Sequence, residues 1–391
     1  MTSSPSAEVN PSNVNPDINT TKPRIEWLDY GKGIGIFLVV LGHTIRGLYD
    51  SANLATPEQF AGINSWIYSF HMPLFFFLSG VFSYSAQRKS IKSFFSDKFR
   101  NIIYPYLVWS VIIGLLRTLS GSNKETLISF VSNLWRLSYY PNDIFWFLYA
   151  LFLVATVHFF CRRALRKIRF SLVFITGLGV IMHGFYFFYQ PPLSGNPIEK
   201  LLIYFVYFAV GASLSNFILN DSFHDLCNDL LNNLKPSKIK APKIKSPQIV
   251  LLSGAIAAFS VISLATYFNI LITKEPNIIL GLVGIMGCLF LAKFLAGIAH
   301  DLPRFKFLKT SLKEWGYCSL QIYVMHTAVI AIVRTILQKG LRINDLAVHI
   351  FLETMLGIYL PLLLTVFTHK IKFPYLFYIP KSSGNQPNQS N

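Results

Sequence analysis

The sequence predicts an all-α protein that crosses a membrane about ten times and has both termini in the cytoplasm. Three observations predict this. Hydrophobic residues make up 52% of the 391 residues and charged residues only 14%, whereas a soluble domain carries about 25% charge. Apolar segments long enough to cross a hydrocarbon core of about 30 Å recur along the chain. Lys and Arg are concentrated in alternate loops, which is the pattern of the positive-inside rule.

The predicted spans and the loops between them set the organisation of the chain. Ends and loops assigned to the cytoplasm hold 24 of the 35 Lys and Arg, and the opposite loops hold six. We expect a disordered cytoplasmic tail at 1–23, a membrane domain at 24–372 and a C-terminal tail at 373–391. The spans are expected near residues 31–49, 62–83, 102–119, 143–160, 170–189, 198–217, 248–268, 278–297, 317–337 and 346–369.

Composition also argues against several classes of function. The net charge is +17, but the basic residues lie in short loops and form no basic face with interleaved aromatic residues, so we expect no nucleic-acid partner. The four cysteines, Cys161, Cys227, Cys288 and Cys318, lack CxxC spacing. We therefore expect neither a disulfide framework nor a metal site.

The first span carries charged and titratable groups on one face. Lys32 and His43 are eleven residues apart, which brings their side chains to within about 20° of each other around the helix and about 16 Å apart along it. Asp29 and Arg46 lie three residues outside this pair. A histidine near the middle of the membrane is costly and predicts a functional role. The alternative is an anchor helix whose histidine is only hydrogen-bonded to a neighbour.

The second span contains His71 two residues before Pro73. The missing backbone donor of a proline predicts a kink there, and a kink frees carbonyl groups that neighbours must satisfy. Gly80 would allow another helix to approach closely. His71 is a candidate catalytic residue, and the alternative is a packing role.

The last two spans carry further polar groups. Tyr323 and His326 are three residues apart in the ninth span, and His349 and Glu353 are four apart in the tenth, so each pair shares a helix face. His326 and Glu353 are candidate catalytic residues, and Tyr323 is a candidate cofactor-binding residue. The alternatives are an interhelical hydrogen bond for His326 and an ion pair with Arg334 for Glu353.

Basic residues at the start of the third span are candidates for binding a phosphorylated ligand. Lys98 and Arg100 lie in the segment 96–106, and the alternative is that both side chains extend to lipid phosphates. His183 is a weaker candidate. The remaining histidines lie at the edges of loops and are expected to be solvated; they are His158, His224, His300 and His369.

Taken together, several segments resemble the membrane acyltransferase-3 family, and its fucose 4-O-acetylase-like sugar O-acetyltransferase branch in particular. The resemblance extends from about residue 24 to 370. The segments that carry it are WLDYGKGIGIFLVVLGH at 27–43, FHMPLFFFLSG at 70–80, KFRNIIYPY at 98–106, FWFLYALF at 145–152 and SLQIYVMH at 319–326.

The resemblance implies an O-acetyltransferase that takes an acyl group from acetyl-CoA at the cytoplasmic face. The acceptor would be a hydroxyl of a cell-surface polysaccharide or its lipid-linked precursor. The basic residue and histidine of the acyl-transfer centre correspond to Lys32 and His43, and many members have Arg where this chain has Lys. Arg keeps a planar fork that Lys lacks. Lys32, Lys98, Arg100 and Tyr323 would contact the donor.

The chemistry of the residues is compatible with that activity. A sugar hydroxyl needs a base with a pKa near neutrality, which histidine supplies, or His43 would carry the acyl group transiently. Expected partners are acyl-CoA, a glycan or lipid-linked glycan, membrane lipid and polysaccharide-assembly proteins, in a bacterial inner or plasma membrane. The alternatives are a glycan or lipid transporter or flippase, and a scaffolding subunit.

Overall fold

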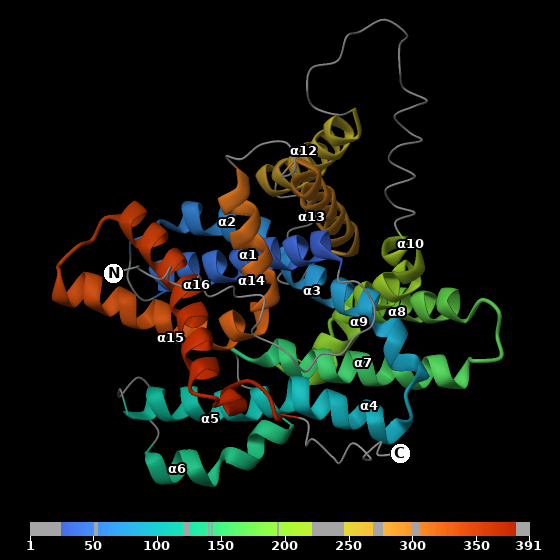
Figure 1. Ribbon diagram of the computed structural model, residues 1–391, viewed down its shortest axis with the longest axis horizontal. Coiled ribbons are helices and arrows are strands. Elements are labelled where there is room, and N and C mark those ends of the chain that lie inside the picture. Colours follow the sequence, from blue (N-terminus) through green and yellow to red (C-terminus); the bar gives the residue numbers. More distant parts are fainter. Residues whose placement is uncertain are drawn as a thin grey trace, which may run out of the picture.

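The computed structural model describes residues 25–50, 54–119, 126–139, 141, 144–193, 195–220, 246–268, 277–298 and 305–380. Every regular element within these ranges is a helix, as the sequence predicts (Figure 1). The α-helices are α1 Glu26–Asp50, α2 Pro57–Tyr68, α3 His71–Val81, α4 Ile91–Lys98, α5 Tyr104–Leu119, α6 Leu127–Ser132, α7 Trp146–Ala164, α8 Ser171–Tyr189, α9 Pro197–Ser213, α10 Ser215–Leu219, α12 Ser246–Tyr267, α13 Ile278–Ile298, α14 Lys306–Tyr317, α15 Ser319–Thr335 and α16 Leu346–Lys370. Short 3₁₀ or π segments are η2 Phe82–Arg88, η3 Phe99–Ile103, η4 Leu134–Ser138, η6 Ile336–Gly340 and η7 Pro374–Leu376.

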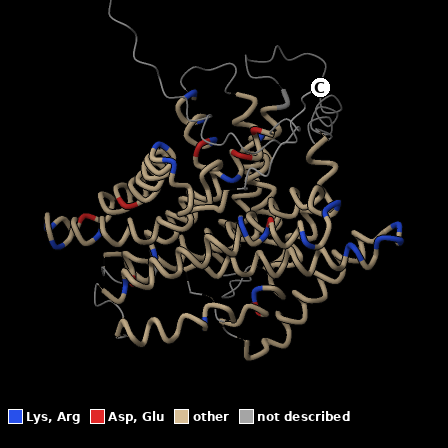
Figure 2. The backbone as a smooth tube through the Cα atoms, turned by 60° about the horizontal axis from the view of Figure 1, so that its bottom comes forward, with Lys and Arg blue, Asp and Glu red and all other residues tan. Residues whose placement is uncertain are grey.

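The described helices include nine that are long and apolar enough to cross a membrane, so the protein is a multi-pass membrane protein. They correspond to nine of the ten predicted spans. The predicted span at 198–217 corresponds to α9, which is 17 residues long and is followed after Leu214 by the short helix α10. The predicted orientation of the two termini stays a prediction. In Figure 2 the helical tubes are tan over most of their length, and Lys, Arg, Asp and Glu occupy short stretches.

Helix α1 lies in the middle of the molecule and contacts α2, α3, α13, α14, α15 and α16 (Figure 1). Its small residues permit this crowding. A Cβ at Gly33 would overlap the carbonyl of Leu312 in α14, and a Cβ at Gly316 would overlap the carbonyl of Asp29 in α1. The two backbones therefore pack in direct contact at the end of α1 that carries Lys32.

The second span is broken just before Pro73, as predicted. Helix α2 ends at Tyr68 and α3 begins at His71, and Pro73 occupies the first turn of α3, where its missing N–H removes no helical hydrogen bond. The expected close approach at Gly80 is also confirmed, because a Cβ there would overlap the carbonyl of Phe208 in α9.

The third span begins earlier than the predicted residue 102. Residues 91–119 form a continuous helical stretch that passes from α4 through the π segment η3 into α5. Short π segments inside helices are frequent at functional sites, and this segment contains Arg100.

The segment after residue 372 folds against the membrane domain as far as it is described. Trp109 of α5 donates a hydrogen bond to the carbonyl of Leu376 over 2.8 Å, and Tyr104 donates to the carbonyl of Tyr375 over 2.6 Å. Phe377 is 3% exposed and packs on the Trp109 ring. Residues 373–380 therefore continue the fold.

Candidate functional site

Two histidines from helices far apart in the sequence meet inside the protein. His43 lies on α1 and His326 on α15, and their ring centroids are 5.1 Å apart with an interplanar angle of 58°. His43 is half-buried and His326 is fully buried. The contact places two imidazoles side by side at the position where the sequence predicts a functional histidine.

The ring of His326 is only partly satisfied by protein groups. Its Nδ1 lies 3.0 Å from the carbonyl of Ile322, one turn earlier on α15, so in a neutral ring Nδ1–H donates and Nε2 carries the lone pair. Nε2 is buried and has no hydrogen-bond partner in the described part of the chain. The ring therefore keeps a proton acceptor available next to His43.

His71 belongs to the same neighbourhood. Its Nδ1 lies 2.8 Å from the carbonyl of Ile67, one of the groups that the break before α3 leaves accessible. Its ring packs edge-on against Tyr68 at 4.6 Å, and His71 lies within electrostatic range of His43. The predicted break beside His71 is therefore confirmed, and its catalytic role stays a prediction.

Tyr68, which the sequence reasoning missed, closes one side of this cluster. Its ring lies against Gly42 of α1 at about 3.3 Å from the place of a Cβ, and Arg46 lies within hydrogen-bonding range of its hydroxyl. The spacing of three residues between Tyr68 and His71 was the available signal, because such residues share a helix face. The helix break at residues 69 and 70 obscured it.

Tyr323 lines the other side. Its ring centroid is 6.1 Å from that of His326, as their shared face predicts. Its hydroxyl donates to the carbonyl of Ile144 over 2.7 Å, so the proton of that hydroxyl is already engaged. We name the group of His43, His326, His71, Tyr68 and Tyr323 the histidine cluster.

Lys32 lies away from the histidine cluster, toward the start of α1. Its Nζ is 3.5 Å from Asp29 and 4.5 Å from the centroid of the Phe82 ring. Phe82 is the first residue of η2. Lys32 and His43 therefore share α1, as predicted, but have different surroundings.

Lys98 also lies close to η2. Its Nζ lies 5.6 Å from the Phe94 ring centroid, and the side chain lines a small hollow together with Ser83 and Gln87 of η2. Arg100 lies two residues later in the π segment and does not line this hollow. The candidate donor-binding residues Lys32 and Lys98 thus both lie close to η2, while Tyr323 lies with the histidines.

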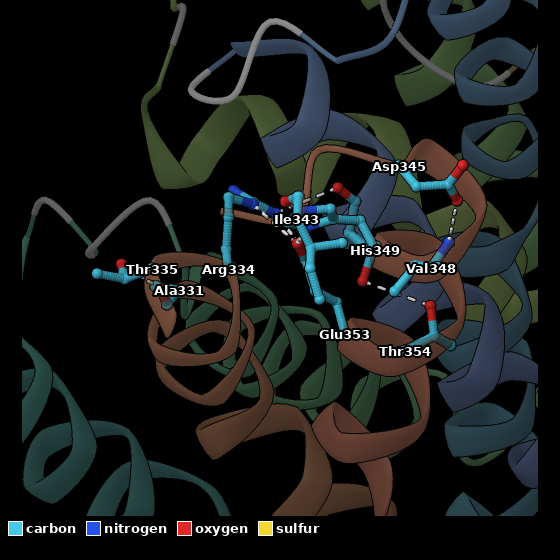
Figure 3. Close-up of polar contacts among 10 residues, drawn as sticks. Ala331, Arg334, Thr335, Ile343, Asp345, Val348, His349, Glu353 and Thr354 are labelled. Carbon is cyan, nitrogen blue, oxygen red and sulfur yellow. Dashed lines mark hydrogen bonds and ion pairs between the residues drawn. The ribbon is translucent and has the colours of Figure 1, made fainter. Parts of the chain in front are cut away.

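Glu353 forms the ion pair with Arg334 that the sequence analysis raised as an alternative (Figure 3). Arg334 donates to both carboxylate oxygens, over 2.7 and 3.2 Å, and to the carbonyl of Thr44 over 3.3 Å. The Nδ1 of His349 lies 2.7 Å from the carboxylate, and its Nε2 lies 2.9 Å from the carbonyl of Ile343. We name Arg334, His349 and Glu353 the arginine cluster. It is linked to α1 through Thr44 and does not include His43.

The expectation that the remaining histidines are solvated is wrong for His158, which is 2% exposed in α7. The apolar residues around it, Phe205 and Phe208 of α9, cover its ring. His183 is also buried, with Nδ1 2.9 Å from the carbonyl of Ile203. His369 is half-buried, and His224 and His300 lie outside the described residues.

The histidine cluster and the lysines near η2 offer different chemistry. Imidazoles with an available nitrogen can accept and return protons, and amino groups beside η2 can bind an anion. Within the described ranges, no group of three or more His, Cys, Asp and Glu side chains is arranged to hold a metal ion. Proton transfer and anion binding are two functions that these side chains support.

Comparison with known proteins agrees with the resemblance noted in the sequence. A segment of 127 residues is 32% identical to the nodulation protein NolL of Mesorhizobium japonicum, and it covers 32% of this chain and 32% of that protein. The chain therefore matches about a third of the length of this curated relative. No solved structure matches the chain. The family described as an acyltransferase domain, Acyl_transf_3, matches residues 25–368. Since that match covers most of the chain, including both neighbourhoods described above, the protein belongs to the acyltransferase-3 family.

Proposed function

We propose that this protein is a membrane O-acetyltransferase that moves an acetyl group from cytoplasmic acetyl-CoA to a hydroxyl of a cell-surface polysaccharide or its lipid-linked precursor. The observation that carries this proposal is the contact between His43 and His326, at 5.1 Å between ring centroids, in a family of acyltransferases.

His43 acts as the general base in this reaction. It removes the proton of the acceptor hydroxyl as the oxygen attacks the thioester carbonyl carbon. The carbon–sulfur bond then breaks, and the proton is returned to the coenzyme A thiolate, which leaves as the free thiol. The products are the acetyl ester and coenzyme A.

His326 acts through His43. Its Nδ1 is held by the carbonyl of Ile322, which fixes the ring and leaves Nε2 as an acceptor. A proton on His43 is therefore stabilised by the neighbouring imidazole. His71, on α3, lies within electrostatic range of His43 and acts on it in the same way, and Tyr323 lies beside the ring of His326.

Lys32, Lys98 and Arg100 bind the donor. Coenzyme A carries phosphates, and amino groups bind phosphate through charge-assisted hydrogen bonds. Lys32 and Lys98 both lie close to η2, which gives the donor a cationic entrance toward the end of α1 that is opposite to Arg46.

Glu353 holds the outer part of this arrangement in place. Its carboxylate fixes Arg334, which binds the carbonyl of Thr44, the residue after His43. Glu353 therefore positions α1 and does not touch the reacting atoms.

The experiment that tests the proposal is acetyl transfer from radiolabelled acetyl-CoA to a glycan by the purified protein in lipid nanodiscs. The variant Lys32→Met is expected to raise the KM for acetyl-CoA about tenfold, because one charged hydrogen bond contributes about 1.5–3 kcal/mol, and Lys32→Arg is expected to restore most of the loss. Movement of a glycan across the membrane without coenzyme A, unaffected by Lys32→Met, would instead identify a transporter.

A further inference from the structure

The small hollow between η2, α4 and α7 contains buried polar groups that the proposed reaction does not use. His158 lines it, and its Nε2 has no hydrogen-bond partner within the described ranges. The side chain is 2% exposed. A buried polar atom without a hydrogen-bond partner lowers the stability of the fold by about 1–3 kcal/mol. We therefore expect a ligand from outside the chain to form a hydrogen bond with this nitrogen.

A second polar group faces the same hollow. The Oγ of Ser83 is buried and likewise has no partner in the described part of the chain. Phe94 and Phe159 cover the apolar side. The hollow has a volume of about 10 Å³, enough for roughly one water-sized atom. It therefore suits one atom of a larger group that remains mostly at its mouth.

The charges around the hollow favour an anion. Lys98 lines it, and Lys98 and Arg162 both lie within electrostatic range of His158. Arg162 is oriented by hydrogen bonds to Gln87 and Ser171. The nearby carboxylate, Asp97, is ion-paired with Lys89. The net charge that Lys98 and Arg162 contribute near the hollow is therefore positive.

We propose that Lys98, Ser83 and His158 form a phosphate-binding subsite, in which one phosphate oxygen enters the hollow and accepts hydrogen bonds from these side chains. Lys98 and the Ser83 hydroxyl donate, and the Nε2–H tautomer of His158 donates as well. The phosphate belongs either to acyl-coenzyme A or to a phospholipid headgroup. The subsite deepens the proposed function, and it rests on that function only in naming the acyl donor as a source of phosphate.

Binding measurements on the full-length protein in nanodiscs of zwitterionic lipid test the subsite. The probes are coenzyme A, adenosine 3′,5′-bisphosphate, which carries phosphates without the thiol arm, and pantetheine, which carries the arm without phosphates. The variants Lys98→Gln, Ser83→Ala and His158→Phe are expected to weaken binding of the two phosphorylated probes about tenfold, equivalent to about 1.4 kcal/mol. Pantetheine binding is expected to stay unchanged.

Matched controls come from similar side chains outside the hollow. His183→Phe removes another buried histidine, and Lys200→Gln removes a lysine that lies over the Trp146 ring. Neither is expected to change the affinity for adenosine 3′,5′-bisphosphate. Thermal unfolding of each variant establishes that it is folded. If His158→Phe does not fold, the binding measurements on Ser83→Ala and Lys98→Gln still test the subsite.

A second experiment, on bound lipid, distinguishes the two sources of phosphate. Native mass spectrometry of protein released from membranes containing phosphatidylglycerol measures retained phospholipid. Retention by the wild type that is lost in the variants, without an effect on coenzyme A, supports the subsite with a headgroup as its ligand. If the wild type and the variants bind each phosphorylated probe with equal affinity and retain equal amounts of lipid, the proposal is overturned. The hollow would then hold only an ordered water. If the wild type transfers acetyl groups but the variants change neither the binding of the phosphorylated probes nor lipid retention, the subsite alone is overturned. If the variants change phosphate binding but the wild type shows no acetyl transfer, the proposed function alone is overturned.

Discussion

The histidine cluster and the arginine cluster share helix α15 and differ in how completely their polar atoms are paired. His326 and Arg334 are eight residues apart on α15, about 12 Å along the helix. In the arginine cluster, both oxygens of Glu353 and both ring nitrogens of His349 have protein partners. In the histidine cluster, Nε2 of His326 is buried without one in the described part of the chain.

The difference separates a structural role from a functional one. A buried charge is tolerated where its partner and hydrogen bonds are complete, and the arginine cluster meets that condition. A buried nitrogen left open costs stability and is retained where another molecule uses it. We therefore assign chemistry to the histidine cluster and positioning to the arginine cluster.

The largest expected effect comes from the histidine cluster. His43→Gln is expected to lower the rate of acetyl transfer at least about 100-fold, because general-base catalysis contributes about 10²–10⁴-fold. The rate with radiolabelled acetyl-CoA measures this, together with the unfolding temperature, which is expected to change little. The control His369→Gln alters a half-buried histidine near the end of α16 and is expected to retain activity. Full activity of His43→Gln would contradict the assignment of the chemistry to the histidine cluster.

The arginine cluster is expected to show the opposite behaviour, a loss of stability without a specific loss of chemistry. Glu353→Gln leaves the charge of Arg334 without its partner and is expected to cost about 3–5 kcal/mol. Denaturant unfolding in detergent measures the loss, and the transfer rate is expressed per folded protein. The double variant Arg334→Met, Glu353→Leu is expected to recover much of the stability. A Glu353→Gln protein that is stable but inactive would place the carboxylate in the reaction.

A smaller effect is expected at the crossing of α1 and α14. A methyl group at Gly316 would overlap the carbonyl of Asp29, so Gly316→Ala is expected to cost about 1–3 kcal/mol through a forced backbone shift. The shift would also move Lys32 and raise the KM for acetyl-CoA. Gly177→Ala in α8 is the matched control, because a methyl group there meets nothing within 4 Å. Equal stability of the two variants would mean that the crossing is looser than described.

The smallest effect is expected from Tyr323→Phe. It removes the hydrogen bond to the carbonyl of Ile144 and is expected to cost about 0.5–1.5 kcal/mol, with a change of only a few-fold in the transfer rate. The control Tyr189→Phe alters a side chain that is 75% exposed. A loss of 100-fold in rate would show that the Tyr323 hydroxyl leaves Ile144 and takes part in the reaction.

Much of the fold is predictable because it follows from composition and periodicity. Apolar length locates the membrane helices, and Pro73 locates the break between α2 and α3. The face shared by Lys32 and His43 follows from the geometry of one helix. Each of these properties depends on residues close together in the chain.

The partners across helices are not predictable in this way. His43 and His326 are 283 residues apart, and no local pattern indicates that their rings meet. The burial of His158 was missed for the same reason, since its cover comes from Phe205 and Phe208 of another helix. For Glu353 the sequence offered catalysis or an ion pair with Arg334. The tertiary contacts show the ion pair, and the catalytic role stays a prediction.

Helix α9 shows a final consequence of packing. Residues 203–209 are buried in succession, all around the helix, because α3, α7 and α8 surround it. Its 17 residues amount to about 26 Å, shorter than a typical hydrocarbon core of about 30 Å. Hydrophobic mismatch is sensed where protein meets lipid, so the shortness of α9 exerts no strain on the bilayer. The thickness of the bilayer instead acts on exposed helices such as α8 and α12. The hydrophobic length of these helices would therefore determine which membrane thickness fits this enzyme.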